Sequence, residues 1–118
     1  MRHYTIVSET DTEIAKASDY SINSTTNLRG TNIVTISKIS ITNASDNAAY
    51  VKLFQDVLIG SDANKHFHLL GGTQTNAKVE IPVGVTLVLD DPFSLNVNTH
   101  KLVVSNTGTN PLLTVRIN

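Results

Sequence analysis

The chain has 118 residues, no cysteine and no tryptophan, and its formal net charge is −1 at pH 7. A single domain of this length can bury enough apolar surface to fold without disulfide bonds or thiolate metal sites. The nine Lys and Arg residues are scattered rather than clustered, which argues against a nucleic-acid partner. No apolar run is as long as a membrane span and the first residues lack the apolar core of a signal peptide, so we expect synthesis in a cytoplasm and no membrane partner.

Charged residues make up only 16% of the chain, against roughly a quarter in a typical globular domain. Asn, Ser and Thr supply much of the remaining polar surface. Hydroxyl and amide groups solvate an exposed face without strong electric fields, as is common on extracellular and particle-associated β-proteins. The apolar residues are mostly Val, Ile and Leu, which suit the pleated surfaces of a β-sandwich.

Residues 1–30 differ in pattern from the rest of the chain. Only Tyr4–Val7 predicts a strand, and 8–30 is polar and rich in turn-forming residues. The one segment with a helical pattern is Thr12–Ala17, for which we expect one or two turns. We therefore predict that 1–30 forms an N-terminal arm, or an edge strand followed by a polar loop, and that 31–118 forms a β-sandwich domain.

From residue 32 onward, turn signals arrive about every ten residues, a spacing typical of sandwiches and barrels. The segment Asn32–Thr42 predicts a strand in which the apolar residues change parity. A β-bulge near Ser37 and Lys38 would reconcile the two halves of this strand.

Two more strands are predicted in the middle of the chain, over Ala49–Ile59 and His66–Leu70. In the second of these we expect Phe67 and Leu69 to point inward. The first places two sets of side chains on opposite faces: Val51, Leu53 and Val57 against Tyr50, Lys52 and Phe54.

The clearest alternation lies between residues 79 and 95. It predicts a strand with one buried face, a turn at Asp91 and Pro92, and a second strand from Phe93. The residues expected on the buried face of the first strand are Val83, Val85, Leu87 and Leu89.

The chain closes on Leu113–Ile117, which predicts a strand with Leu113, Val115 and Ile117 inward. About eight strands result. The predicted fold is therefore all-β, an antiparallel β-sandwich of about eight strands that is jelly-roll-like, with an immunoglobulin-like strand order as the alternative.

Histidines and acidic residues give weak indications of chemistry. His66 and His68 lie two residues apart, so they could supply two ligands to Zn²⁺, but two ligands do not complete a site and an exposed strand face or a subunit contact is favoured. Asp90 and Asp91 could act as paired carboxylates, yet Asp before Pro is ordinary turn chemistry. We predict no metal, no cofactor and no catalytic residue, and hence no enzyme.

Aromatic residues are few, and two of them share a face of one predicted strand. Tyr50 and Phe54 lie opposite Val51 and Leu53, so they could form an intersubunit patch, a second core layer or a platform for a glycan. All three alternatives remain open at this stage.

Three segments carry a resemblance to a known class of proteins. They are Ile41-Thr42-Asn43 leading into Val51-Lys52-Leu53-Phe54, then 81–90 with the sequence Ile-Pro-Val-Gly-Val-Thr-Leu-Val-Leu-Asp, and Leu113–Ile117. With these segments, the chain resembles small virion structural proteins of tailed phages, especially phages of marine bacteria. The polar segment 8–30 departs from the pattern of that class.

This resemblance implies a non-enzymatic part of a virus particle. The expected function is a capsid decoration, or cement, protein that binds and stabilises the shell, with the major capsid protein or a tail protein as partner and the virion as location. We expect a homo-oligomer, most simply a trimer. The partner-binding residues we expect are Tyr4, Thr5, Ile6 and Val7, whose strand would add to a neighbouring β-edge, together with Tyr50 and Phe54.

The alternative function is a tail or fibre module that binds a host surface or a glycan. In that case, Gly60–Asn64 and Gly71–Asn76 are the loops expected to form the binding end.

Overall fold

The computed structural model describes residues 2–16, 19, 33–60 and 65–118. Within these ranges the chain is all-β, and no helix there could cross a membrane. The described strands, in chain order, are β1 (Arg2–Ile6), β2 (Asp11–Ile14), β3 (Ile33–Ile36), β4 (Ile39–Asn43), β5 (Ala49–Val57), β6 (Phe67–Leu70), β7 (Val79–Ile81), β8 (Thr86–Leu89), β9 (Phe93–Asn96), β10 (His100–Thr107) and β11 (Leu113–Ile117).

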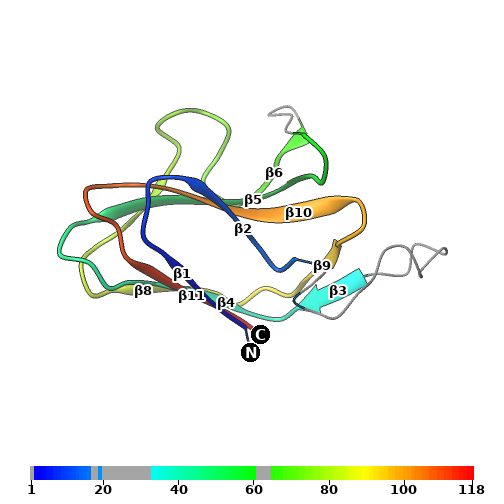
Figure 1. Cartoon of the computed structure of the whole chain (residues 1–118), viewed down its shortest axis with the longest axis horizontal. Coiled ribbons are helices and arrows are strands. Elements are labelled where there is room, and N and C mark those ends of the chain that lie inside the picture. Colours follow the sequence, from blue (N-terminus) through cyan, green and yellow to red (C-terminus); the bar gives the residue numbers. More distant parts are fainter. Residues whose placement is uncertain (1, 17–18, 20–32, 61–64) are drawn as a thin grey trace.

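The strands form two facing sheets and one short ribbon (Figure 1). Sheet A has the order β1-β11-β4-β8. Sheet B has the order β2-β10-β5-β6, and β7 also pairs with β5. Strands β3 and β9 form the two-stranded ribbon at one end of the molecule.

Pairing follows a simple rule along the chain. The first five strands, β1 to β5, pair in reverse order with strands of the second half: β1 with β11, β2 with β10, β3 with β9, β4 with β8, and β5 with both β7 and β6. The chain is therefore one long antiparallel ribbon that turns back after β5. Winding this ribbon brings β11 beside β4 and β10 beside β5, which closes the two sheets. The two ends of the chain consequently lie side by side (Figure 1).

The core is a single apolar cluster between sheets A and B. Both N-terminal strands contribute to it, since Ile6 of β1 and Ile14 of β2 are almost fully buried. The inward residues predicted for the last strand, Leu113, Val115 and Ile117, are confirmed. The boundary predicted near residue 30 lies outside the described residues.

The helical turn predicted from Thr12 is wrong. Residues Asp11–Ile14 form a strand because they pair antiparallel with β10, where Ile14 lies opposite Leu102. The chain leaves the strand at Ala15, whose φ of 52° ends the extended conformation.

The strand predicted over Asn32–Thr42 is divided into β3 and β4, which belong to different sheets. The break falls at Ser37 and Lys38, where a bulge was expected. Both residues donate backbone hydrogen bonds to the carbonyl oxygen of Asn118, at 2.7 and 3.3 Å. The change of parity therefore marks a corner at which the chain passes from the ribbon into sheet A.

The buried face predicted at Val83 and Val85 is also wrong, because both side chains are exposed, Val83 to 52%. Gly84 has a φ of +76°, and the backbone N–H of Val85 donates to the carbonyl of Pro82 at 3.1 Å, as in a type II turn. The N–H of Gly84 donates to the carbonyl of Asn43, whose own N–H donates to the carbonyl of Val85, which is a G1 bulge. Strand β8 therefore starts only at Thr86.

Candidate docking surface

Sheet A presents a row of threonines on the face that points away from the core. Cross-strand register aligns one threonine from each strand of the sheet: Thr5, Thr114, Thr42 and Thr86. The hydroxyl groups of Thr42 and Thr86 lie 2.7 Å apart and are hydrogen-bonded. We call this outward surface of sheet A the threonine face.

An apolar row and a polar row flank the threonines. On one side, alternation along the strands places Val7, Leu112 and Ala44 outward, and the N–H of Ala44 donates to the carbonyl of Leu112 at 2.9 Å. On the other side lie His3, Arg116, Ser40 and Val88, which the register also aligns. No Asp or Glu stands at an outward position of the described part of this sheet. A surface whose described residues include one Arg and no Asp or Glu costs less to desolvate against another protein than a highly charged surface does.

The two edges of sheet A are strands β1 and β8, and no described strand pairs with their outer sides. Backbone groups alternate in direction along an antiparallel strand. Because Asn43 bonds to Val85, the groups of Leu87 face β4, and those of Thr86 and Val88 face outward. By the same alternation, Thr5 of β1 directs its N–H away from β11.

The outward face of sheet B differs, because a second layer of side chains covers part of it. Phe54 is only 5% exposed, and its ring stacks on that of His66 with centroids 4.3 Å apart. The ring of His68 lies 5.2 Å from Phe54 and 5.9 Å from His66. We call this surface the histidine face. Of the two residues expected to point inward from β6, Phe67 is 64% exposed, so that prediction is wrong, whereas Leu69 is half-buried and packs against the core.

A contact between an imidazole and a buried carboxylate lies on the histidine face. The Nε2 atom of His66 is 3.2 Å from the Oδ2 atom of Asp56, which is almost fully buried, and the N–H of Val57 donates to Oδ1 at 2.8 Å. Burial lowers the pKa of His68 from its usual value of 6.5, and the positive charges of His66 and Lys52 lower it further. The cluster therefore binds one imidazole to a carboxylate and disfavours the charged form of the other.

Two small depressions lie beside Phe54, of about 170 and 190 Å³. The larger is lined by Asp11, Lys52, Phe54, His66, His68, Thr73 and Ser105. The Nζ atom of Lys52 donates to the carbonyl of Gln74 at 2.8 Å, which ties the Gly71–Asn76 loop to this face. Among the described residues, no group of three His, Cys, Asp or Glu side chains is arranged to hold a metal ion.

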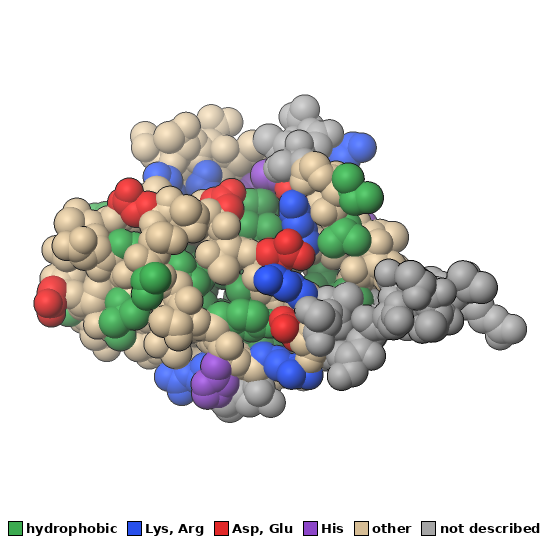
Figure 2. Space-filling view, viewed as in Figure 1, with side chains coloured by type: hydrophobic (Ala, Val, Ile, Leu, Met, Phe, Trp, Pro, Cys, Tyr) green, Lys and Arg blue, Asp and Glu red, His purple; other side chains and the backbone are tan. Residues whose placement is uncertain are grey.

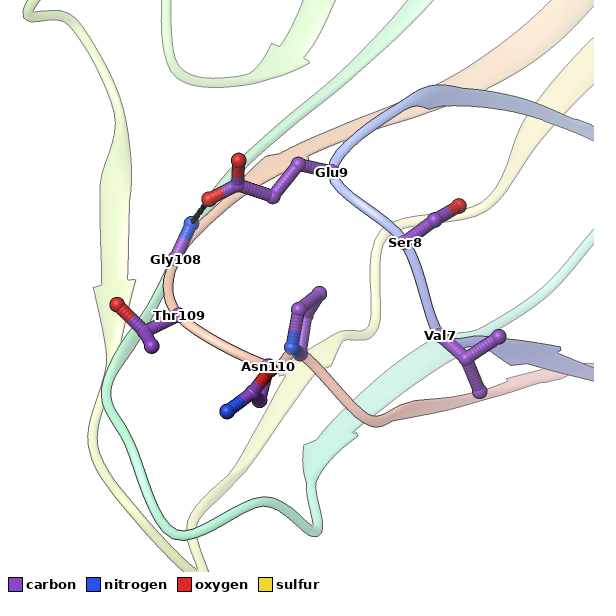
Figure 3. Close-up of a pocket in the computed structure, with 7 residues that line it drawn as sticks. Val7, Ser8, Glu9, Gly108, Thr109 and Asn110 are labelled. Atoms are coloured by element: carbon purple, nitrogen blue, oxygen red, sulfur yellow. Dashed lines mark hydrogen bonds between the residues drawn. The ribbon is translucent and has the colours of Figure 1, made fainter.

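A further hollow, of about 460 Å³, lies between the β1–β2 and β10–β11 connections (Figure 3). The Glu9 side chain reaches across it, and its Oε1 atom accepts a hydrogen bond from the N–H of Gly108 at 2.9 Å. Nearby, the Nδ2 atom of Asn106 donates to the carbonyl of Ser8 at 2.7 Å. These contacts hold the two connections together across the hollow.

The residues predicted to bind a partner do not form one surface. Thr5 and Val7 lie on the threonine face, Ile6 is in the core, and Tyr4 is half-buried, with its hydroxyl bonded to Asp19 and to the N–H of Ala15. On the histidine face, Tyr50 is exposed and Phe54 is covered. Asp90 and Asp91 are exposed in the connection between β8 and β9. Gly60 is exposed, and the rest of the predicted Gly60–Asn64 loop lies outside the described residues.

Sequence reasoning missed the row of threonines. Each threonine stands at an outward position of its own strand, which alternation can show, but the row exists only through the register between four strands.

Searches against protein-family models, curated proteins and solved structures each found no significant match to the chain.

Proposed function

We propose that the chain is a non-enzymatic structural protein of a phage virion, and that it decorates and stabilises the capsid shell. The observation that carries this proposal is the threonine face, a surface that spans all four strands of sheet A and has no acidic side chain among its described residues. Such a surface suits broad contact with another protein better than it suits the enclosure of a substrate.

We further propose that the fold is an eight-stranded jelly roll with one added ribbon. In a jelly roll, a long antiparallel ribbon is wound so that strands one and eight, two and seven, three and six, and four and five are partners. The reverse-order pairing here has this form if β3 and β9 are counted as the added ribbon and β6 and β7 as one interrupted strand. Jelly rolls are frequent among viral capsid and lectin domains, which supports the proposal by analogy.

Docking would act through many copies. A decoration protein contacts its shell at every equivalent lattice site, so weak contacts reinforce the shell through avidity. The exposed edge of β1 adds a second means of attachment, since an edge strand can extend a neighbouring sheet by main-chain hydrogen bonds. The partner in this proposal is the major capsid protein, or a tail protein if the position on the particle differs.

The test is cosedimentation of the purified chain with native particles or expanded empty shells. We expect stoichiometric binding by the natural chain. Thr114→Arg, in the middle of the threonine face, should abolish binding, while Ser105→Arg on the histidine face serves as the matched control and should bind normally. Failure of the natural chain to bind, or equal binding by both variants, would contradict docking through the threonine face.

The edge of β1 is tested separately. Thr5→Pro removes an outward N–H without removing a bond to β11, and weaker shell binding would show that the edge is used. Deleting residues 1–29 is a less specific test, because it also removes Ile6 and Ile14 from the core. We expect that deletion to unfold the domain.

The alternative function, a tail or fibre module that binds a host glycan, is favoured by one observation. The depression of about 190 Å³ on the histidine face combines an aromatic ring with hydroxyl, amine and carboxylate groups beside the Gly71–Asn76 loop. A glycan array with the purified chain tests it, and signals lost in Lys52→Ala but kept in Thr114→Arg would support it. Such a result together with no shell binding would replace the capsid proposal.

A further inference from the structure

Strand β8 forms one border of sheet A, and no described strand pairs with its outer side. Thr86 and Val88 direct their backbone N–H and C=O groups outward, away from β4. Both side chains are exposed, Val88 to 50%, and Leu87 and Leu89 are only half-buried although they point toward the core side. This border therefore presents hydrogen-bonding groups that no described strand engages, together with incompletely covered apolar side chains.

Proteins usually protect such an edge with charges, prolines within the strand or a covering segment. From Val83 to Leu89 the chain has no charged residue, and Pro82 and Pro92 lie outside the strand. The opposite edge is better protected. Strand β1 begins with two basic residues, Arg2 and His3.

We propose that β8 pairs antiparallel with β8 of a second copy, around a two-fold axis at Leu87. In this register, Thr86 of one copy exchanges two backbone hydrogen bonds with Val88 of the other, and the symmetric pair exchanges two more. The two Leu87 residues face each other across the axis. Sheet A and its copy then form one continuous sheet.

Charge is compatible with a second copy as the occupant, and it favours the antiparallel over the parallel pairing. The antiparallel pairing places Asp90 opposite Gly84, so no acidic residue faces another. A parallel pairing in register would place the two Asp90 side chains together, where like charges destabilise a sheet. The edge is thus complementary to itself in the antiparallel register. This pairing does not depend on shell binding and would hold for a tail module as well.

The first test is the mass of the purified chain in solution. We expect twice the 12.8 kDa of one chain by light scattering, whereas the trimer expected from the sequence would give three times that mass. Val88→Pro removes an outward N–H and should give the mass of one chain. Thr5→Pro makes the matching change at the other edge and should leave the dimer intact. A monomeric or trimeric natural chain would overturn the proposal.

A second test does not depend on how well the proline variant folds. Because the chain has no cysteine, a single introduced cysteine reports the register directly. Leu87→Cys should form a disulfide-linked dimer under mild oxidation, since facing residues of this type have Cα atoms about 4.5 Å apart, within the range of a disulfide. Leu89→Cys, on the same side of the strand, should not, because its copy would lie more than about 13 Å away. Equal cross-linking of both variants, or of neither, would contradict the pairing.

Discussion

The outward faces of the two sheets differ in how far other side chains cover them. On the histidine face, Phe54, Asp56 and Val103 are buried under a second layer of side chains, although they point away from the core. On the threonine face no second layer is formed by the described residues, and the central row consists of threonines. The sandwich needs only its inner faces to fold, so the extra layer makes sheet B a structural wall, and sheet A is the face that we propose to dock.

Figure 2, a side view of the two layers, adds a difference in charge between them. Acidic side chains lie mainly over the half that contains β2, β5 and β10, and the lower border shows basic and histidine side chains with little red. The burial pattern of strand β5 shows that sheet B is covered on both sides, because the consecutive residues Leu53 and Phe54, which point to opposite faces, are both buried. A strand covered on both faces loses its clean alternation.

The largest effect is expected at Phe54. If removing this side chain left the free energy of unfolding unchanged, the second layer on the histidine face would have no structural role. We expect Phe54→Ala to lower the free energy of unfolding by about 3 kcal/mol, because it empties a buried site beneath two imidazole rings. Chemical denaturation with matched slopes measures this loss. A loss below about 1 kcal/mol, within the range of ordinary surface substitutions, would mean that the second layer is loosely packed.

Two glycines with nearly the same backbone conformation sharpen the comparison. Gly71 and Gly84 have φ of +78° and +76°, but a Cβ at Gly71 would lie 2.6 Å from the carbonyl oxygen of Ala77, while one at Gly84 would meet nothing within 4 Å. Gly84→Ala should cost about 1 kcal/mol through φ alone, and Gly71→Ala about 2 kcal/mol or more because the Ala77 carbonyl is held by a hydrogen bond from Gly72. Thermal unfolding of both variants measures the difference, and equal losses would contradict the steric argument.

The fold class could be predicted because it depends on local alternation. Leu113, Val115 and Ile117 repeat with a period of two and are all buried, and the same holds for Val51 and Leu53. The errors occur where a local element interrupts the pattern. The turn and bulge at Gly84 shift the apolar series of Val83 and Val85 out of the core, a change that the alternation alone does not signal.

The candidate surface could be predicted only in part. Alternation showed that Tyr50 and Phe54 share an outward face, but not that His66 and His68 would cover one of them and leave the other exposed. The row that includes Thr114 depends on pairing between residues far apart in the sequence. Such register is set by winding of the whole ribbon, so no single segment carries it.

The histidine face should also respond to pH. Because the pKa of His68 is lowered in the folded protein, the unfolded chain takes up a proton first as pH falls below 6.5. The free energy of unfolding should therefore fall from pH 6.5 downward until the folded pKa has been passed, and be unaffected by this group above pH 6.5. Denaturation across this range should show a smaller fall for His68→Gln.

A second variant identifies the cause of that shift. Lys52→Met removes one of the positive charges that lower the pKa of His68, and should reduce the fall without eliminating it. If both variants kept the full pH dependence of the natural chain, another group would be responsible.

The smallest effect is expected on the threonine face. Thr42→Val keeps a β-branched side chain and removes the hydrogen bond to Thr86, so the free energy of unfolding should change by no more than about 0.5 kcal/mol. The same substitution changes the pattern of donors and acceptors at the centre of the surface proposed to dock, and should weaken shell binding measurably. Thr12→Val is the control, since Thr12 lies on β2 beside Val104 and away from both outward faces. A threonine face that can be changed at almost no cost to folding, but not without loss of binding, is what separates a docking surface from a structural wall.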